Sequence, residues 1–474
     1  MQIDQNITAL ALLQATQRVF QLAEEKTAAL DRHWDVKRGT PVFTVEGKYS
    51  TRGWTEWTQG FQYGCLILAG DALDDRTLID LGKSRTIERM LPHVTHVGVH
   101  DHGFNNLSTY GNLLRLMNEG RLEENPWERS TYENAIAASG AVQAARWSPT
   151  QCGLGYVYSF NGPHSLFIDT MRTTRILGVA FQLGHCLMGE NDAKINLLGR
   201  SIQHGLATSK YIVFHGDSSH TYDVRGRTAH EGTFNRNDGN FRARSTQQGY
   251  SPFSTWTRGL AWAMLGYAEK LEFFQTLPTA AFKQAVGLTK REVLDEYQRS
   301  AIDTCDHYID DVSAQDGVTY WDDGAPMLHR LGDWRSRPAD PFNDFEPVDA
   351  SASAIAAQGL IRLGNFLGPR SGKRYVQAGL SVAKTLFDEP YLSIKKSHQG
   401  LLLHSIYHWP NRWDHVPKGQ KVASGESSMW GDYHLLELAL LIQRIAQQET
   451  YPAFFVQSAR QSLVSFNANQ RGDG

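Results

Sequence analysis

The sequence predicts an all-α protein, an (α/α)6 barrel in which six inner helices alternate with six outer helices. Two observations carry this prediction. Amphipathic segments alternate with segments that are apolar nearly all round, and each apolar segment begins with a short polar or aromatic motif. Helical hairpins of this kind cannot bury their apolar faces alone and must stack on their neighbours. We therefore expect residues 1–474 to form a single barrel domain.

Amphipathic, charge-bearing segments are the candidates for the outer helices. Apolar residues recur in them at three- and four-residue spacing, with polar residues on the opposite face. The candidate outer segments are 6–25, 72–91, 128–147, 192–211, 289–311 and 371–388.

The candidates for the inner helices are apolar on every face, as in 259–267 and 435–442, which suits helices that are buried all round. In a barrel, the N-terminal ends of all inner helices gather at one mouth, so we expect residues far apart in the sequence to meet there. The predicted inner helices start near Trp57, Asp101, Asp169, Trp256, Asp349 and Trp430.

Long connections precede several inner helices, notably 212–253, 312–347 and 389–428, and they are rich in Gly, Ser, Pro and aromatic residues. Long loops in a compact domain are usually functional, so we expect these to build the walls of a cleft. Two segments inside or beside them, 210–214 and 320–324, predict small β-hairpins.

Charge and composition exclude several classes of partner. The 47 basic and 50 acidic residues are spread along the chain and give a formal net charge of -3, so neither nucleic acid nor an anionic membrane is expected. No apolar stretch is long enough to span a bilayer, and the N-terminus lacks the features of a secretory signal. We therefore expect a cytoplasmic protein. Nothing in the sequence predicts an oligomeric state.

Two aspartates stand at the predicted starts of inner helices, Asp101 in H-D-H-G-F and Asp169 in F-I-D-T-M. An isolated aspartate at such a place most often caps the helix. Asp169, however, is flanked by Phe167, Ile168 and Met171 and precedes an apolar helix. A desolvated carboxyl has a raised pKa and holds a proton near neutrality, as a general acid must. The sequence thus favours an acid/base role for Asp169.

Aromatic residues cluster at the same helix starts. A single ring at helical spacing is more often core, but repeated rings beside Thr, Arg and Gln predict walls on which a sugar stacks. Arg258 suits a substrate carboxylate, with a helix-end salt bridge as the alternative. The aromatic candidates are Trp54, Trp57, Phe104, Phe160, Trp256, Trp262 and Trp430.

Histidines are dense at His93, His96, His100 and His102, but no metal site is predicted. The segment lacks a matching carboxylate arrangement, Pro92 and nearby residues break the helix that would align ligands, and the cysteines show no C-x-x-C spacing. In a long loop, His220 is a candidate substrate contact, with an ordinary loop histidine as the alternative.

Nine short motifs run in order through almost the whole chain. They are T-E-W-T-Q-G-F at 55–61, H-D-H-G-F at 100–104, I-D-T at 168–170, D-S-S-H-T at 217–221, T-Q-Q-G at 246–249, S-T-W-T-R-G-L-A-W at 254–262, D-G-V-T-Y-W-D at 316–322, D-A-S-A-S-A-I at 349–355 and M-W-G-D-Y at 429–433. Together they resemble the unsaturated glucuronyl hydrolases of glycoside hydrolase family 88 and, more distantly, the unsaturated rhamnogalacturonyl hydrolases of family 105.

This resemblance implies a catalytic (α/α)6 barrel without metal or organic cofactor, and an oligosaccharide substrate whose terminal uronic acid carries the double bond left by a polysaccharide lyase. In the implied reaction Asp169 protonates C4 and activates a water that attacks C5, while Asp101 assists. The hemiketal formed opens and releases the aglycone. The resemblance also implies a substrate-lining role for a further set: Trp57, His100, His220, Gln248, Trp256, Arg258 and Trp262.

The chain departs from the family pattern where the aglycone would lie. Phe160 and Asn161 stand where a Trp-Gly pair is usual, His102 adds a polar group, and the 325–348 insertion is longer. We expect Phe160 to contact substrate and the identity of the aglycone to differ.

Two other activities remain open from the sequence. A saturated exo-β-glucuronidase on the same barrel would divide acid and base roles between Asp169 and Asp101. A sugar epimerase or isomerase would pair His220 with His100 or His408. A non-catalytic glycan-binding barrel is a third alternative.

Overall fold

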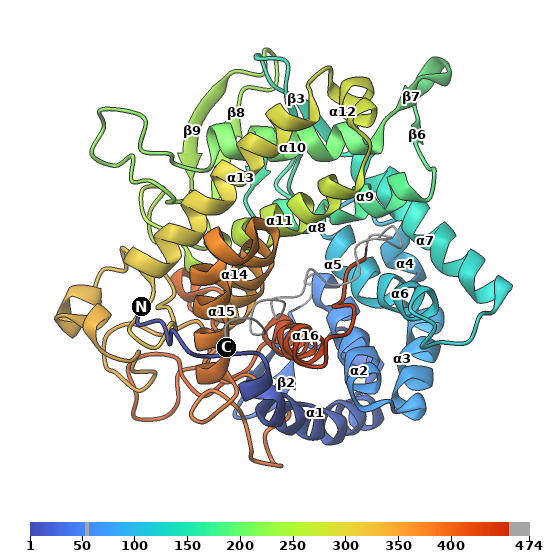
Figure 1. Ribbon diagram of the computed structural model, residues 1–474. Helices are drawn as coiled ribbons and strands as arrows, with labels where there is room; N and C mark the ends of the chain where they lie inside the picture. The colour runs from blue at the N-terminus through green and yellow to red at the C-terminus, as the bar shows by residue number, and fades with distance from the viewer. Residues whose placement is uncertain (53–55, 455–474) are drawn as a thin grey trace, which may run out of the picture.

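A closed ring of helices forms the centre of the molecule (Figure 1). The computed structural model describes residues 1–52 and 56–454. The candidate residue Trp54, and Thr55 at the start of the first motif, lie outside the described residues. Within the described residues, each of six inner segments contacts the next and the last contacts the first. The inner segments are α2 (Gln59–Leu73); α5, η4 and α6 (His102–Asn106, Leu107–Gly111 and Asn112–Asn118); α8 and α9 (Thr170–Thr173 and Arg175–Gln182); α11 (Thr257–Thr276); α14 (Ala350–Ser371); and α16 (Met429–Ala446).

Six outer helices pack around this ring, so the predicted all-α (α/α)6 barrel is confirmed. The first outer helix begins later than the predicted 6–25, and the other five lie close to their predicted ranges. The outer helices are α1 (Leu13–His33), α3 (Arg76–Arg89), α7 (Pro126–Ala145), α10 (Leu197–Tyr211), α13 (Lys290–His307) and α15 (Lys373–Leu386).

Short helical turns and small strands complete the described chain. The turns are η1 (Leu10–Leu12), η2 (Val36–Arg38), η3 (Glu56–Thr58), α4 (Leu91–Val94), η5 (Glu190–Asp192), α12 (Thr279–Val286), η6 (Tyr308–Val312), η7 (Leu328–Leu331), η8 (Trp334–Ser336) and η9 (Trp409–Asn411). The strands are β1 (Phe43–Val45), β2 (Lys48–Ser50), β3 (Trp147–Pro149), β4 (Gly155–Val157), β5 (Ser165–Phe167), β6 (Leu187–Met188), β7 (Lys194–Ile195), β8 (Glu231–Phe234) and β9 (Phe241–Ser245).

The strands pair locally as β1 with β2, β3 with β4 and β6 with β7, while β5, β8 and β9 form one antiparallel sheet. The predicted hairpins at 210–214 and 320–324 are wrong. Lys210 and Tyr211 belong to the end of α10, and Val213, Tyr320 and Asp322 make only isolated bridges. These bridges join loops to distant segments instead of forming local hairpins.

Burial explains the two classes of helix. In α16 every residue from Met429 to Arg444 is buried, whereas α1 buries one stripe that includes Val19, Phe20 and Ala23. A helix surrounded by neighbours needs apolar residues on all faces, and one at the rim needs them on a single face.

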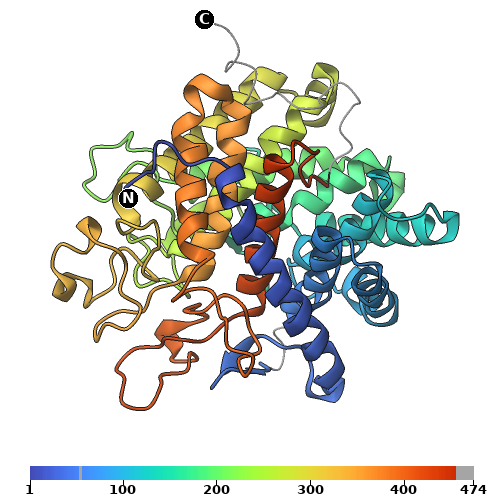
Figure 2. The same ribbon diagram turned by 60° about the horizontal axis from the view of Figure 1, so that its bottom comes forward.

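The N-terminal ends of the inner helices share one side of the barrel with the long connections. Figure 2 shows the orange-to-red chain between α15 and α16 at that end, together with the β1–β2 hairpin. This arrangement places the loops around the mouth. No helix in the described residues has the length and apolar content needed to cross a membrane. The cytoplasmic setting stays a prediction.

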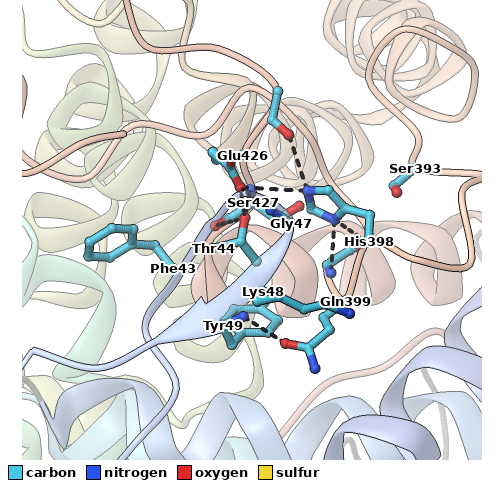
Figure 3. Close-up of polar contacts among 12 residues, drawn as sticks. Phe43, Thr44, Gly47, Lys48, Tyr49, Ser393, His398, Gln399, Glu426 and Ser427 are labelled. Atoms are coloured by element: carbon cyan, nitrogen blue, oxygen red, sulfur yellow. Dashed lines mark hydrogen bonds and ion pairs between the residues drawn. The ribbon is translucent and has the colours of Figure 1, made fainter. Parts of the chain in front are cut away.

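Polar contacts anchor the β1–β2 hairpin to the connection before α16 (Figure 3). Glu426 Oε2 accepts from Thr44 Oγ1 at 2.5 Å and from the Gly47 amide at 3.1 Å. The Tyr49 amide donates to Gln399 Oε1 at 2.7 Å. These bonds tie the beginning of the chain to the loop that leads into the last inner helix.

Two inner segments approach closely at Gly103. Its amide donates to Thr173 Oγ1 at 2.8 Å, and a Cβ added to Gly103 would lie 1.9 Å from the carbonyl oxygen of Thr173. We expect Gly103→Ala to lower the free energy of unfolding by about 1–3 kcal/mol, because the helices must move apart. Denaturant unfolding followed by circular dichroism measures the change.

Gly189→Ala is the matched control, since its added Cβ would meet its nearest neighbour at an ordinary 3.4 Å. A change within about 0.5 kcal/mol is expected there. Equal destabilisation by both substitutions would contradict the close approach.

Candidate active site

A cavity of about 280 Å³ opens at the N-terminal ends of the inner helices. This size is near the lower end of the range for small-molecule sites. The residues that line it come from seven stretches of chain: Trp57; His93, His96, Val99, His100, Asp101, Phe104 and Asn105; Phe160; Phe167 and Asp169; Gln247 and Gln248; Trp256, Arg258 and Trp262; and Tyr407, His408, Asn411 and Trp413.

Most of the residues predicted from the sequence meet in this cavity. The lining set includes Trp57, His100, Asp101, Phe160, Asp169, Gln248, Trp256, Arg258 and Trp262. His220 is exposed in the 212–230 loop, where its ring stacks on Tyr222 at 4.9 Å, and it does not line the cavity.

His100 stands between the two aspartates. Its Nε2 lies 3.1 Å from Asp169 Oδ1 and 3.9 Å from Asp101 Oδ1. All three side chains are largely buried. One imidazole therefore serves two carboxylates from different inner helices in a site that excludes most water.

Neither aspartate caps its helix through its side chain, although each occupies the N-cap position of α5 or α8. Asp349 behaves differently, because its Oδ1 accepts from the amides of Ser351 and Ala352 at 3.1 and 3.4 Å. The capping role, which is the common one for such aspartates, thus applies to Asp349, while the carboxylates of Asp101 and Asp169 remain available in the cavity.

The three charges shift one another's pKa. Burial raises the pKa of Asp101, and the nearby Asp169 charge adds to this while His100 opposes it. Burial also acts to raise the pKa of Asp169, but the charge and hydrogen bond of His100 outweigh it, and the net pKa is lowered. For His100, burial is outweighed by the two carboxylates, so its pKa is raised.

The raised pKa expected for Asp169 is therefore wrong. The sequence reasoning accounted for desolvation and had no means of placing His100 at hydrogen-bond distance. The opposite directions of the two pKa shifts favour a proton on His100 and an ionised Asp169.

Arg258 is held in a buried network. Its Nη1 donates to Asp349 at 2.5 Å and to the Ile406 carbonyl. Its Nη2 donates to the Tyr407 carbonyl at 2.7 Å and to Gln248 Oε1 at 3.1 Å. The salt bridge that was the alternative for Arg258 is thus present. Because the Gln248 carbonyl already accepts from arginine, the amide nitrogen of Gln248 is its donor group toward the cavity.

His230, which sequence reasoning missed, is a buried residue directly behind the cavity lining. Its ring centroid lies 4.4 Å from that of Phe167 and 4.9 Å from that of Trp256. Nδ1 accepts from the Gln247 amide at 3.0 Å, so the neutral ring carries its proton on Nε2, which has no hydrogen-bond partner among residues 1–52 and 56–454. Burial lowers the pKa of His230 to about 4, which keeps the ring neutral near pH 7.

Aromatic rings form one side of the cavity. Trp57 stacks on Trp430 at 5.1 Å and donates from Nε1 to the Tyr407 hydroxyl at 3.3 Å. Phe104 packs on Trp262 at 4.8 Å. Hydrogen bonds and ring contacts fix these side chains before any ligand arrives, so a sugar ring meets a prearranged apolar wall.

A second wall comes from the loop 407–413, whose residues were not predicted as site residues, apart from His408 in the epimerase alternative. Tyr407, His408, Asn411 and Trp413 all line the cavity, and Asp414 accepts the amide of His408 at 2.9 Å. The expectation that the long connection 389–428 builds a wall of the cleft thus agrees with the lining set, although the individual residues could not be singled out from the sequence.

The dense histidines do not converge on a common point. His93 Nε2 lies 2.6 Å from Gln59 Oε1, and His102 Nδ1 lies 2.7 Å from Ser139 Oγ. Among the described residues, no group of three His, Cys, Asp or Glu side chains is arranged to hold a metal ion.

Comparison with known proteins adds sequence and structural relatives, although no family model matches the chain. The unsaturated chondroitin disaccharide hydrolase of Streptococcus pyogenes serotype M1 is 26% identical over 416 residues, covering 85% of this chain and 84% of the relative. The unsaturated glucuronyl hydrolase of Formosa agariphila is 26% identical over 392 residues, covering 81% and 78%. The chain is a homologue of the unsaturated glucuronyl hydrolases. This confirms the resemblance drawn from the nine motifs.

Solved structures of other unsaturated glucuronyl hydrolases share the fold. The unsaturated glucuronyl hydrolase of Bacillus sp. GL1 matches with a TM-score of 0.67 and 20% identity over 90% of this chain and 97% of that one. A Streptococcus agalactiae unsaturated glucuronyl hydrolase, solved in complex with dGlcA-GalNAc6S, matches with a TM-score of 0.59 and 20% identity over 92% and 93%.

The contact between His100 and Asp169 predicts a measurable coupling. Asp169→Asn is expected to lower the pKa of His100, because it removes a charge and a hydrogen bond that raise it. Imidazole NMR spectra recorded across pH measure the shift. His102, whose pKa burial lowers to about 3, is the internal control and stays unchanged. An unaltered His100 titration would contradict the contact.

Proposed function

We propose that this protein is a glycoside hydrolase that releases a terminal unsaturated uronic acid from lyase-generated oligosaccharides by hydrating the C4=C5 double bond. The observation that carries the proposal is His100 Nε2 between Asp169 and Asp101, at 3.1 and 3.9 Å, inside an aromatic-lined cavity. Hydration of an enol ether needs one group that gives a proton and then takes one from the attacking water, and it needs no nucleophilic side chain.

In the proposed reaction Asp169 protonates C4, and the positive charge that develops is shared by C5 and the ring oxygen. Water attacks C5 and returns a proton to Asp169. The resulting hemiketal opens to a ketone, and the hemiacetal left at C1 breaks down with loss of the aglycone. Each proton given is recovered, so no further reactant besides water is consumed.

We infer that His100 is the source of the proton that Asp169 gives to C4, because the raised pKa of His100 and the lowered pKa of Asp169 favour a proton on the imidazole. Binding of a uronate adds a negative charge beside the buried carboxylates, which raises their pKa by repulsion. The proton then moves from His100 Nε2 to Asp169 Oδ1 across the 3.1 Å contact. Asp101, whose pKa is already raised, holds His100 from the other side.

Gln248, which lines the cavity, is the first proposed donor to the unsaturated sugar. His230 lies outside the lining set, directly behind Phe167 and Trp256, and is proposed as the second donor. Gln248 offers its amide nitrogen because Arg258 fixes its carbonyl, and His230 offers the unpartnered Nε2–H. In this proposal the Trp57, Trp256 and Trp262 rings provide the stacking surface, and Phe160 and the 407–413 loop, which also line the cavity, contact the aglycone. We assign no substrate contact to His220.

The epimerase alternative is weakened by this geometry, because His220 is outside the cavity and His408, whose pKa burial lowers to about 4, is a poor proton carrier at neutral pH. A saturated exo-β-glucuronidase remains the second candidate, since two carboxylates share the cavity.

Asp169→Asn tests the central role. Wild-type protein is expected to remove the ultraviolet absorbance of unsaturated disaccharides prepared with several polysaccharide lyases. The variant should lose about 10²–10⁴-fold in kcat, as is usual for removal of a general acid or base.

Chromogenic saturated glucuronides serve as the control substrate and should not be cleaved. Constant absorbance with every unsaturated disaccharide, together with cleavage of the saturated glucuronide, would replace the proposal with the second candidate.

His230→Phe tests the assignment of the buried histidine. It keeps a ring against Phe167 and Trp256 but removes both the Nε2 donor and the Nδ1 atom that accepts from the Gln247 amide. We therefore expect kcat/KM to fall by at least roughly 5- to 10-fold, the usual value of one hydrogen bond. His220→Phe is the matched control with no change expected. A larger loss from the His220 substitution would reverse the assignment.

A further inference from the structure

The turn at 321–323 lies behind two cavity residues and contacts both segments that carry them. Asp322 forms an isolated antiparallel bridge with Trp256, the N-cap residue of α11, and the Thr257 amide donates to the Trp321 carbonyl at 3.1 Å. On the other side of the same turn, the Asp322 side chain faces the 246–250 segment, which carries Gln248.

The Asp322 carboxylate is fully buried and accepts from two backbone amides. Its Oδ2 accepts from Tyr250 at 2.8 Å, and its Oδ1 accepts from Gly324 at 2.9 Å. The position a Cβ would occupy on Gly249 lies 3.0 Å from Oδ2 and 3.0 Å from Trp256 Cβ. Asp322 is thus packed directly against the residue that follows Gln248.

We infer that Asp322 is a positioning residue for the substrate site, which holds the 246–250 segment so that Gln248 presents its amide to the unsaturated uronic acid. This inference rests on the proposed function. Asp322 does not line the cavity, so its effect passes through the backbone of Tyr250 and Gly249 to the neighbouring Gln248.

The ionisation state of Asp322 sets the strength of the hydrogen bonds that its carboxylate accepts from the amides of Tyr250 and Gly324. An ionised carboxylate accepts both amides as charge-assisted bonds, whereas a protonated one offers a hydroxyl at one oxygen and weakens one of them. Burial, with the charge of Asp323, raises the pKa of Asp322 to about 7. As pH falls through that value, Gln248 is held less firmly.

The charged neighbours of Asp322 are themselves paired. Asp323 Oδ1 accepts from the Thr255 amide at 2.6 Å, and its Oδ2 lies 3.6 Å from His307 Nε2. His307 also contacts Asp311 at 3.0 Å, and Arg258, which follows Trp256 on α11, is bound to Asp349. Asp322 itself accepts backbone amides and makes no ion pair in the described structure.

Asp322→Asn is the direct test, because the amide places an NH2 group against one of the two N–H donors. For hydrolysis of unsaturated disaccharides at pH 8, we expect KM of the variant to be about 10-fold higher than that of wild type, because one charge-assisted hydrogen bond is lost. We expect kcat to change less than about 3-fold. In wild type KM rises as pH falls below neutrality. In the variant KM is high at all pH values and this dependence is absent.

Asp316→Asn is the matched control. Asp316 is a mostly buried aspartate of the preceding loop that accepts the amides of Val318 and Ala339, each at 3.2 Å, and burial raises its pKa as well. Its bonds hold segments away from Gln248, so KM and its pH dependence should match wild type.

A double-mutant cycle with Gln248→Ala separates positioning from a general loss of stability. If Asp322 acts through Gln248, adding Asp322→Asn to Gln248→Ala raises KM by less than 2-fold. Additive effects, or an unchanged pH dependence of KM in folded Asp322→Asn, overturn the inference. Where Asp322→Asn fails to fold, Asp322→Glu, which keeps the charge and shifts its position, replaces it. Inactive wild type with every unsaturated disaccharide would instead reject the proposed function.

Discussion

A buried network of opposite charges joins the inner helices across the barrel axis. Arg172 of α8 donates to Glu269 of α11 at 2.5 Å and to Glu437 of α16 at 2.9 Å, and Arg175 lies 3.3 Å from Glu269. Each side chain is at most 4% exposed. Such pairs add little stability over well-packed apolar residues, but breaking one leaves an uncompensated buried charge. We infer that the network specifies which helices meet, and hence where their N-terminal ends converge.

The cavity also depends on the meeting of the N-terminal ends of the inner helices. Trp262 packs on His434 at 5.0 Å, and His434 belongs to the helix that supplies Glu437. Asp101 and Asp169 belong to adjacent inner segments, and His100 couples them. The chemistry of the cavity is therefore a property of the closed ring, since no single hairpin carries both carboxylates and the aromatic wall.

The sequence predicted the inner helices well because each combines an apolar run with a distinctive start. Asp169, Trp256 and Asp349 were placed within one residue of their observed helix starts. The direction of the Asp169 pKa shift was not predictable, because it depends on a 3.1 Å contact with His100. Likewise, the sequence pointed to His220, in its D-S-S-H-T motif, as a substrate contact, but this residue is exposed. His230, ten residues later, was not predicted, and it is buried beside the cavity.

The anchoring of the β1–β2 hairpin bears on the order in which the protein acquires its site. Thr44 and Ser427 exchange hydrogen bonds across 383 residues of sequence, and Phe43 and Arg52 then contact Tyr407 and Trp413 of the cavity wall. Contacts of such long sequence separation form late, because much of the chain must be ordered first. Asp101 and Asp169 precede the residues of this wall by more than 230 positions in the sequence. The carboxylates can therefore be brought together by their own helices before the wall that encloses them is in place.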